Sequence, residues 1–400
     1  MADATCAGCG CLCDDIVATV AGGWLEVSGT CALGDAWFAD RAAGPVARLD
    51  GREASLDEAA DAAAEILRNA RAPLVYGLGR TSNEAQRRAV ALAEAAGAIV
   101  DPARSGEAGL AFQAIGSSTA TFGEIRDRAE VVVCWRADPV AANPRLLGRL
   151  RLDRTARGSR SLVVVDAQHT ATAAEADAFV ALEAAQDFEA LWALRALVAG
   201  APLDGDGAAG LPLDGLGDLA QRMRGARHVA ILHSGGAELD ALALLWLVRD
   251  LARDRHAVSL GLRRDGNAQG AEDVLAAQTG FPTAVSFARG HPRANPGELS
   301  AAALLARGEV DAALVIASDP LADLPHDAAQ RLRDLPTVVI DARETATAQA
   351  ARVAFAPAVD GIEVAGTAHR MDGVPVPLHA LLASERPAAA DVLAAIAERL

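Results

Sequence analysis

The chain has 400 residues, a length that suits about two to four domains or one large α/β assembly. Hydrophobic residues make up 52% of it and charged residues 22%, which is typical of a globular protein rather than a disordered one. All 37 basic residues are arginine. The absence of lysine excludes a lysine-containing P-loop, a pyridoxal-phosphate Schiff base and any lysine nucleophile.

Net charge and hydropathy limit the partners of the chain. The formal net charge of −16 opposes binding to nucleic acid, which depends on cationic neutralisation. No apolar run approaches the roughly 18 residues that span a bilayer, and the N-terminus lacks the pattern of a secretory signal. We therefore expect a cytoplasmic protein with neither nucleic acid nor a membrane as a partner. In a reducing cytosol, clustered thiols are expected to be ligands rather than disulfides.

Residues 1–50 are predicted to form a cysteine-rich N-terminal domain with short strands at 16–20 and 24–27. Five of the six cysteines lie in its first 31 residues, and the sixth lies in an apolar strand far along the chain. Four of the five fit the pattern C-x2-C-x3-C-x17-C and are candidate metal ligands, with Cys11 as the spare: Cys6, Cys9, Cys13 and Cys31.

Four soft sulfur ligands favour either a [4Fe-4S] cluster or a tetrahedral zinc ion. Structural zinc usually takes two separated C-x2-C knuckles, and this segment has one, which tilts the choice toward iron–sulfur. The remaining alternative is that the cysteines bind nothing and are small hydrophobic residues.

Helical periodicity begins after this domain. Ser55 and Glu58 form a capping box, and apolar residues recur behind them at helical spacing. Residues 73–76 are predicted to form a buried strand, and Thr81 with Glu84 is expected to open a second helix. This succession of strand, glycine turn and helix recurs along the chain and predicts parallel βαβ units.

Two segments recur in the same order and indicate an internal duplication. Asp166 and Asp341 each end an apolar strand and precede a Thr-Ala-Thr-Ala sequence, at an offset of 175 residues (341 minus 166). Asp138-Pro139 and Asp319-Pro320 also follow matched strands, at an offset of 181 (319 minus 138). Two nearly equal offsets are hard to obtain by chance. Strands 74–76 and 229–232, which open the two copies, correspond loosely.

The fold class is therefore α/β, with two duplicated Rossmann-like parallel-sheet halves. We predict a first half at 51–220 and a second at 221–355. The Cys-rich domain at 1–50 precedes them. A C-terminal extension at 356–400 follows them and ends in a helix.

Two features near the ends of the predicted strands have open interpretations. The Asp-Pro pairs at 138–139 and 319–320 stand at the carboxyl ends of strands, where doubly wound sheets bind ligands, but Asp-Pro is also a common turn. Gly77-Leu-Gly79 matches two glycines of a dinucleotide fingerprint, with Ser82 at the third position. A tight strand-to-helix turn explains it equally well.

Histidines and serines show no catalytic motif. The eight histidines are scattered, and none forms H-x-H or H-E-x-x-H, so the sequence does not predict a histidine-built hydrolytic metal site. A G-x-S-x-G nucleophile elbow is also absent. Composition and spacing alone thus predict a duplicated α/β protein with a thiolate site.

A series of motifs resembles the B-type subunit of formylmethanofuran dehydrogenase over essentially the whole chain. They run in order through the cysteine segment with Asp14-Asp15-Ile16, Cys31-Ala-Leu-Gly34, Tyr76-Gly-x-x-x-Thr-Ser-x-Glu84-Ala-Gln86, Thr121-Phe-Gly-Glu124, Asn143-Pro-Arg145, Asn295-Pro-Gly-Glu298, Ile316-Ala-Ser-Asp-Pro320 and Glu363-x-x-Gly-Thr-Ala-x-Arg370-Met. The resemblance implies a molybdopterin oxidoreductase fold and a [4Fe-4S] cluster on the N-terminal cysteines. It also implies tungsten or molybdenum on two pterin cofactors, where carbon dioxide and formate interconvert.

The chain departs from this family at the metal. The family's Cys-His-Gly element, which supplies a metal ligand and a histidine that assists the redox step, falls on Arg104-Ser105-Gly106. A guanidinium is a permanent cation without a lone pair for a soft metal, and serine does not titrate near neutrality. Arg263 matches the arginine that lies beside the metal in the family. We therefore expect no catalytic residue here and no tungsten or molybdenum pterin.

A member that has lost its redox centre resembles the B-type subunit of the bacterial formyltransferase/hydrolase complex. That resemblance implies three kinds of partner: a formyltransferase subunit, an amidohydrolase-like subunit that releases formate, and a C-type subunit. This chain would be a non-catalytic scaffold of one-carbon metabolism linked to tetrahydromethanopterin. Arg104 and Arg263 would either line a formate-binding void or, for Arg104, fill the vacated space against an acidic neighbour.

Two other hypotheses remain from the sequence. The intact N-terminal cysteines motivate an active tungsten- or molybdenum-dependent dehydrogenase subunit with an altered metal ligand, because a cluster without an electron destination has little use. A free-standing small-molecule binding protein would need no partner subunits at all.

Overall fold

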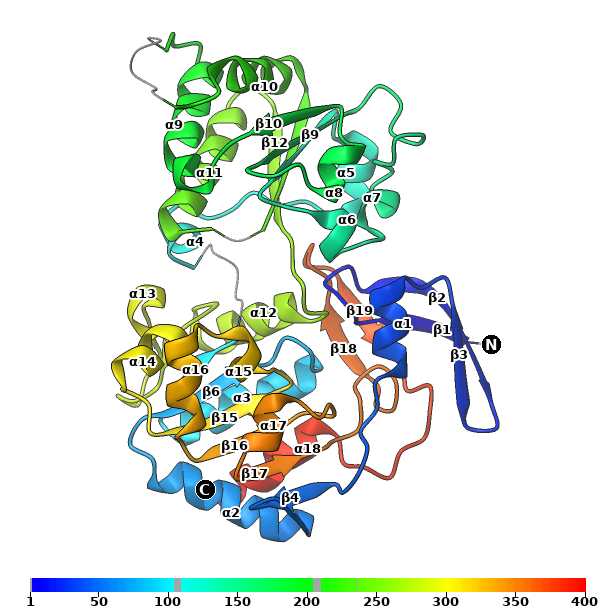
Figure 1. Ribbon diagram of the computed structural model, residues 1–400, viewed down its shortest axis with the longest axis vertical. Helices are drawn as coiled ribbons and strands as arrows, with labels where there is room; N and C mark the ends of the chain where they lie inside the picture. Colours follow the sequence, from blue (N-terminus) through cyan, green and yellow to red (C-terminus); the bar gives the residue numbers. More distant parts are fainter. Residues whose placement is uncertain (1, 104–108, 204–209, 235) are drawn as a thin grey trace. The chain divides into compact units, whose positions relative to one another are not determined.

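The chain folds into two main sheets of mostly parallel strands, each covered by helices (Figure 1). The structure is a computed structural model, and it describes residues 2–103, 109–203, 210–234 and 236–400. Two compact units divide the chain: Met1–Ser105 together with Asp265–Leu400, and Gly106–Arg264. We name the first the split unit and the second the inserted unit, because the second interrupts the first in sequence.

A nine-stranded sheet forms the centre of the split unit, in the order β14-β13-β7-β6-β15-β16-β17-β4-β5. The strands from β7 to β17 are parallel, and the outer strands are antiparallel. The sheets β1-β2-β3 and β18-β19 complete the unit. Its strands are β1 Ala2–Cys6, β2 Cys13–Ala21, β3 Trp24–Ser28, β4 Ala47–Leu49, β5 Arg52–Ala54, β6 Pro73–Gly77, β7 Ile99–Asp101, β13 Val285–Ser286, β14 Arg293–Ala294, β15 Ala312–Ile316, β16 Thr337–Ile340, β17 Val353–Phe355, β18 Gly366–His369 and β19 Pro375–Leu378.

Helices cover both faces of this sheet, because neighbouring strand residues point to opposite sides. Val75 belongs to the core under α2, α3, α12 and α18, whereas Leu74 and Tyr76 belong to the core under α14, α16 and α17. The helices of the unit are α1 Ala32–Ala39, α2 Leu56–Asn69, α3 Asn83–Ala95, α12 Ala268–Thr279, α13 Pro296–Leu299, α14 Ala301–Arg307, α15 Pro320–Asp323, α16 His326–Arg333, α17 Ala346–Ala350 and α18 Ala389–Ala397.

The inserted unit has a five-stranded parallel sheet in the order β10-β9-β8-β11-β12. Helices α9, α10 and α11 pack on one face around a core of strand valines and helix leucines. Its elements are α4 Gly109–Ile115, α5 Phe122–Arg128, β8 Val131–Trp135, α6 Pro139–Ala142, α7 Leu146–Arg149, β9 Ser161–Asp166, α8 Ala171–Glu175, β10 Ala178–Ala181, α9 Asp187–Val198, α10 Leu213–Gly225, β11 His228–His233, α11 Glu238–Leu251 and β12 His256–Gly261.

The two copies of the predicted duplication are interleaved. In the split unit β6 pairs with β15, and in the inserted unit β11 pairs with β8, so each sheet joins the opening strand of one copy to the later strands of the other. The predicted consecutive halves at 51–220 and 221–355 therefore do not match the observed units. Sequence offsets identify equivalent segments, but they do not say which copies share a sheet.

The terminal domains predicted at 1–50 and 356–400 are also parts of the split unit. The expected C-terminal helix is present as α18, which packs against α2 and α3 in the main core. Strand β19 contacts β1, and the hydroxyl of Thr5 donates to the carbonyl of Pro377 at 2.8 Å. Hydrophobic burial thus ties both ends of the chain to the central sheet.

The two helix starts predicted from capping residues had different outcomes. The capping box of Ser55 and Glu58 is confirmed at the start of α2. Helix α3, in contrast, is capped by Ser82 rather than by Thr81, and the side chain of Ser82 accepts a hydrogen bond from the amide of Ala85. The carbonyl of Thr81 accepts a hydrogen bond from the side chain of Asn267, a tertiary contact that the local sequence does not contain.

The aspartate of each Asp-Pro pair forms the same set of hydrogen bonds in its own unit. Asp138 accepts hydrogen bonds from the amide and the hydroxyl of Thr172, at 3.0 and 2.5 Å. Asp319 accepts the equivalent bonds from Thr347, at 3.0 and 2.6 Å. Each threonine hydroxyl also accepts from a backbone amide of the helix that follows the Asp-Pro pair. These aspartates therefore join consecutive strand ends, a tertiary contact that the Asp-Pro sequence did not predict.

The described part of the chain contains no helix with both the length and the hydropathy that crossing a bilayer requires.

We expect Thr347→Val to lower the free energy of unfolding by about 1–3 kcal/mol, because valine keeps the volume but removes the hydroxyl that donates to the half-buried carboxylate of Asp319 and accepts from the amide of Leu321. Thr172→Val should have a similar effect in the inserted unit. Urea unfolding followed by circular dichroism measures both. Thr347→Ser, which keeps the hydroxyl, is the matched control, and an equal loss in the serine and valine variants would contradict the role of the hydrogen bond.

Candidate functional site

The candidate cysteine ligands converge at one end of the three-stranded sheet in the split unit. Cys6 ends β1 and pairs in register with Cys13 at the start of β2, and Cys9 lies in the turn between them. Cys31 precedes helix α1 as its N-terminal capping residue. Cys6, Cys9 and Cys13 are buried and Cys31 is half-buried. The hairpin and the helix start therefore bring together residues that span 25 positions of sequence (31 minus 6).

Two glycines let the backbone close around these sulfur atoms. A Cβ atom on Gly34 would lie 3.0 Å from the Sγ of Cys6, and a Cβ on Gly8 would lie 2.8 Å from the carbonyl oxygen of Leu33. The amide of Gly8 also donates to the Sγ of Cys6 at 3.5 Å. Both positions require glycine, because the loop and the first turn of α1 approach each other so closely.

Burial and neighbouring thiols disfavour the thiolate forms of Cys6 and Cys11. Burial is the main cause that raises the pKa of Cys6 to about 12, with contributions in the same direction from Cys13, Cys9 and Cys31, while the amide of Gly8 opposes the shift. Hydrogen bonds with Cys13 and Cys9, followed by burial, raise the pKa of the spare Cys11 well above its usual value. A bound metal would supply the positive charge that thiolates need here.

The chemistry of the donor set admits either of the two candidate metals. Four thiolates suit a [4Fe-4S] cluster or a tetrahedral zinc ion, because both centres select soft sulfur ligands. Cys6, Cys9, Cys13 and Cys31 would hold the metal in either case.

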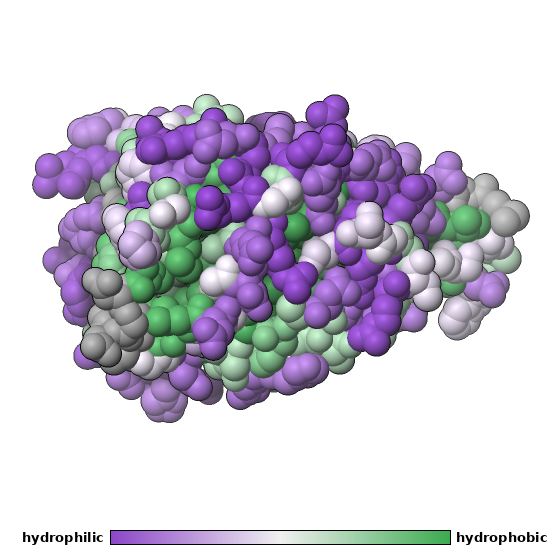
Figure 2. All heavy atoms as spheres, turned by 90° about the horizontal axis from the view of Figure 1, so that it is seen from above, coloured by the Kyte–Doolittle hydropathy of each residue, from purple (hydrophilic) through white to green (hydrophobic). Residues whose placement is uncertain are grey.

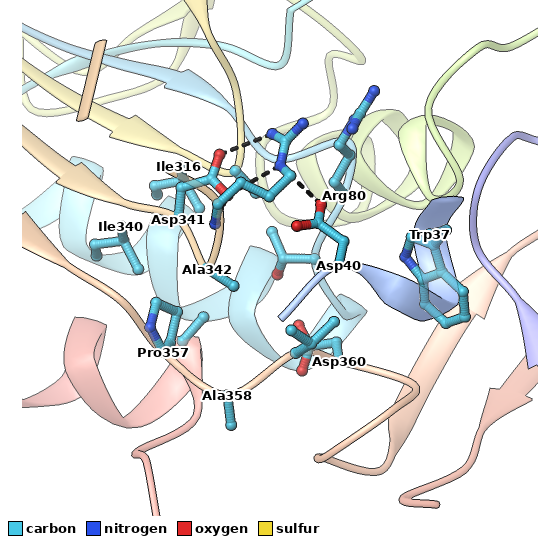
Figure 3. A pocket seen from close by; sticks show the side chains of 15 residues that line it. Trp37, Asp40, Arg80, Ile316, Ile340, Asp341, Ala342, Pro357, Ala358 and Asp360 are labelled. Carbon is cyan, nitrogen blue, oxygen red and sulfur yellow. Dashed lines mark hydrogen bonds and ion pairs between the residues drawn. The ribbon is translucent and has the colours of Figure 1, made fainter. Parts of the chain in front are cut away.

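Helix α1 connects the cysteine loop to a crevice in the same unit (Figure 3). Cys31 precedes the first residue of α1, and Trp37 and Asp40 at the C-terminal end of the helix line the crevice. The two ends of this eight-residue helix are about 12 Å apart along its axis. The crevice is small, with a cavity volume of about 60 Å³. Residues at or after the ends of β6, β15, β16 and β17 form most of its wall, so it lies at the carboxyl edge of the sheet.

The crevice lies where the strand order of the sheet reverses. From β6 the chain proceeds to β7 on one side, and from β15 it proceeds to β16 and β17 on the other. Ligands of doubly wound sheets bind at such a switch point. Gly77 ends β6 with φ of +113°, and a Cβ there would lie 2.2 Å from the carbonyl oxygen of Ile316. A glycine is therefore needed at this position, because any side chain would prevent β6 from lying this close to β15.

The glycine turn after β6 does not fit a phosphate group. A Cβ on Gly79 would lie 3.2 Å from a carboxylate oxygen of Asp265, so a negative charge already stands beside the turn. Arg80 forms an ion pair with the same carboxylate at 2.8 Å. The tight-turn interpretation of Gly77-Leu-Gly79 is the one that the contacts support, and the dinucleotide interpretation is not.

Acidic side chains dominate the interior of the crevice. Arg343 pairs with Asp341 at 2.8 Å and lies 3.9 Å from Asp40, as the dashed lines in Figure 3 show. Burial raises the pKa of both aspartates, and the guanidinium of Arg343 opposes the shift. Burial likewise raises the pKa of Asp360 to about 6, although the amide of Ser82 donates to its carboxylate at 2.8 Å. Burial thus makes the ionised form of these carboxyl groups costly, and the acidic lining of the crevice disfavours a bound anion.

Asn267 holds the loop between the crevice and the cysteine site. It is 2% exposed, and its amide group donates to the carbonyl of Thr81 at 2.7 Å and to the side chain of Asn83 at 2.9 Å. Its side-chain oxygen accepts from the amide of His369 at 2.7 Å. Next to it, a Cβ on Gly266 would lie 2.2 Å from the carbonyl oxygen of Ala7. Asn267 was not predicted from the sequence, because its partners are distant along the chain and no motif marks it.

The predicted degenerate metal site is only partly described. Arg104 and Ser105 lie outside the described residues. Arg263 belongs to the inserted unit, two residues after β12, and its carbonyl accepts a hydrogen bond from the side chain of Asn143 at 2.9 Å. Asn143 is fully buried and begins the Asn-Pro-Arg motif of the family resemblance. This motif therefore fixes the backbone that carries Arg263.

Two solved structures share this architecture. Acetylene hydratase from Pelobacter acetylenicus aligns with 99% of this chain and 69% of its own, with a TM-score of 0.72 and 15% identity. A chain of the formyltransferase/hydrolase complex FhcABCD from Methylorubrum extorquens, solved with methylofuran, aligns with 88% of this chain and 98% of its own, with a TM-score of 0.71 and 29% identity. The interleaved parallel sheets and the cysteine domain thus define a protein with the molybdopterin oxidoreductase fold, as predicted.

Sequence relatives identify the family within this class. The B-type subunit of tungsten-containing formylmethanofuran dehydrogenase 2 from Methanocaldococcus jannaschii is 35% identical over 404 residues, which cover 94% of this chain and 92% of that protein. The B-type subunit of the formyltransferase/hydrolase complex Fhc from Methylorubrum extorquens is 30% identical over 336 residues, covering 80% and 86%. No family model matches the chain. The chain belongs to the family of B-type subunits of formylmethanofuran dehydrogenase.

The raised pKa of Asp360 predicts a pH-dependent contribution to stability. The folded chain holds this proton up to about pH 6, whereas the unfolded chain releases it near the ordinary value of 3.8, so the contribution is present below pH 3.8 and is lost as pH rises through 6. Asp360→Asn keeps an acceptor for Ser82 without the charge. We expect it to unfold with a free energy about 1–3 kcal/mol higher than wild type at about pH 7.5, and similar to it at about pH 4. Urea unfolding at both pH values measures this, and a difference independent of pH would contradict it.

Proposed function

We propose that this chain is the B-type subunit of a formyltransferase/hydrolase complex and acts there as a non-redox scaffold in one-carbon metabolism linked to tetrahydromethanopterin. Formyl transfer and hydrolysis to formate take place in partner subunits. The observation that carries the proposal is Arg104-Ser105, which stands where the family resemblance places a thiolate metal ligand and a histidine. The match to 98% of a chain of the FhcABCD complex supports it.

The same observation argues against a tungsten or molybdenum pterin. A guanidinium cannot ligate a soft metal, because it has no lone pair to offer. The crevice of the split unit adds support, since both of its guanidinium groups, on Arg80 and Arg343, are paired with carboxylates and offer little to a cofactor phosphate. We therefore propose that the cavity inherited from the family serves no redox step.

We further propose that Cys6, Cys9, Cys13 and Cys31 hold a [4Fe-4S] cluster that stabilises the N-terminal domain. The single C-x2-C pair favours a cluster over zinc, and the burial of three of the four thiols and the amide of Gly8 that donates to Cys6 are compatible with it. A bound cluster would tie β1, β2 and α1 together, because its ligands come from all three. Bound zinc, or no bound metal, is the result that would contradict the cluster.

The alternative function is an active tungsten- or molybdenum-dependent dehydrogenase subunit with another metal ligand. Three observations favour it. The four cysteines are intact, and α1 runs from them toward a crevice at the carboxyl edge of the sheet. The relative at 35% identity is also named as tungsten-containing. A cytoplasmic location is the sequence-based expectation for either function.

Partner subunits would need an accessible surface, and exposed hydrophobic side chains offer one on the inserted unit. Phe112 on α4, Phe188 and Trp192 on α9, and Leu239 on α11 are 37–61% exposed, and α11 packs against both other helices. Figure 2 shows hydrophobic side chains that gather at the surface between hydrophilic ones. Exposed apolar clusters of this kind mark protein interfaces. We propose that a formyltransferase, amidohydrolase-like or C-type subunit of the same complex covers this cluster.

Elemental analysis of the purified complex tests the scaffold against the dehydrogenase. We expect neither tungsten nor molybdenum in stoichiometric amount, and about four iron atoms per copy of this chain. Stoichiometric tungsten or molybdenum would overturn the scaffold proposal, and zinc in place of iron would overturn the cluster.

A matched pair of variants provides the control for this measurement. Cys9→Ala should lose the iron and lower the stability of the N-terminal domain, whereas Cys11→Ala, which removes a buried thiol from the same loop, should retain the iron. Equal iron content in the two variants would contradict the proposed ligand set.

Co-purification tests the partners. An affinity-tagged copy of this chain, expressed in its own source cells, should bring down formyltransferase and amidohydrolase-like subunits that mass spectrometry identifies. The double variant Phe112→Ser with Leu239→Ser should recover about tenfold less of them, since each exposed apolar anchor contributes to an interface. Trp24→Ser, at an 81% exposed position on β3, is the control and should recover the wild-type amount. A monomer without these subunits would sink the proposed complex.

A further inference from the structure

A group of metal-binding side chains lies in the inserted unit, which does not contain the cysteine loop. Glu124 on α5, His228 at the start of β11 and His256 at the start of β12 place one ligand atom each within 4.8 Å of the other two. In the described residues this is the one group of three histidine, cysteine or acidic side chains that meets this distance. None of the sequence motifs for metal sites contains these residues.

Strand register produces the histidine pair. His228 and His256 are the first residues of two adjacent parallel strands and lie directly opposite each other. Their rings stack with centroids 4.4 Å apart. The backbone fixes both positions, since the carbonyl of His228 accepts from the amide of Glu130 at 2.9 Å and the amide of His256 donates to the carbonyl of Arg227 at 2.9 Å. The backbone thus holds the two imidazole rings stacked on each other before any ion binds.

Glu124 completes the group from helix α5. It lies in the first turn of this helix, where its amide donates to the capping hydroxyl of Thr121 at 3.2 Å. One of its carboxylate oxygens lies 3.5 Å from the Nε2 of His256. Ligand atoms around a tetrahedral ion with metal–ligand distances of about 2.1 Å are about 3.4 Å apart, so this pair already has the required spacing.

The burial of the three side chains suits an ion that keeps one open position. His228 is 5% exposed, and its Nε2 is buried without a hydrogen-bond partner, a state that is costly for a polar atom. The side chains of Glu124 and His256 are 30% and 52% exposed, which gives an ion access from solvent. Two imidazoles and a carboxylate on the protein side leave the fourth tetrahedral position to water.

The charges around the group permit a cation. Burial lowers the pKa of His228, and His256 and Arg128 lower it further, whereas Glu124 and Glu130 oppose the shift. Glu130 is paired with Arg227 at 2.9 Å, so Glu124 is the carboxylate that offsets Arg128 on the same helix.

We propose that Glu124, His228 and His256 bind a divalent first-row cation such as Zn²⁺, and that this ion fastens α5 to the amino ends of β11 and β12. Imidazole and carboxylate donors suit Zn²⁺, and no thiolate is needed. The site lies at the amino edge of the sheet, whereas ligands of doubly wound sheets bind at the carboxyl edge. The ion would therefore stabilise the inserted unit and would not take part in chemistry at the strand ends opposite.

Zinc titration of the chelator-treated complex tests this proposal by isothermal calorimetry at neutral pH. We expect His256→Asn and Glu124→Gln each to weaken one Zn²⁺-binding event by about 100-fold or to abolish it. His326→Asn, which changes an exposed histidine in the split unit, is the control and should leave that event intact. The side chains of Glu124 and His256 are partly exposed, so these two variants are expected to fold.

Thermal unfolding supplies the second measurement. Zn²⁺ should raise the unfolding temperature of the wild-type complex and of His326→Asn, but not of His256→Asn, because an ion that binds only the folded state stabilises it. Equal Zn²⁺ affinity and an equal thermal shift in wild type and His256→Asn would overturn the proposal. Since the readouts are zinc affinity and stability, they do not depend on whether the chain is a scaffold or a dehydrogenase subunit.

Discussion

The parallel pairing of β6 with β15 is the constraint on which the split unit depends. It joins strands that are more than 200 residues apart, and it requires the glycine at position 77, because any side chain there would meet the carbonyl of Ile316. The pairing creates the switch point of the sheet and so the crevice at its carboxyl edge. The inserted unit is formed by the chain that lies between β6 and β15 in sequence.

Short-range structure and long-range packing cooperate at the cysteine site. A hairpin brings Cys6 beside Cys13, and the start of α1 adds Cys31. The loop around Asn267 and the C-terminal strands then close over this hairpin, through the contact of Gly266 with Ala7 and the burial of Leu12 against β18 and β19. The cysteine domain is therefore a part of the split unit's fold, and a metal bound there would stabilise elements from both ends of the chain.

The proposed scaffold keeps the architecture of its family while the chemistry at one position differs. The hydrogen bonds of Asp138 and Asp319 repeat in both units and join consecutive strand ends through side chains of the chain itself. The crevice retains its place at the switch point, yet its arginines are paired with acidic side chains. In the inserted unit, the histidine and glutamate group would add stability at the other edge of the sheet.

Local sequence determined the elements, the duplication, the four-cysteine pattern and the family, because capping residues, hydrophobic periodicity and motif order act over a few residues. Only tertiary structure decided that the two copies interleave and that His228 lies opposite His256. It also decided that Asn267 forms a hydrogen bond with Thr81 and that Asp360 forms one with Ser82. Those outcomes depend on which strands pair and in which register. Pairing energies are set by burial across the whole sheet, which no short stretch of sequence records.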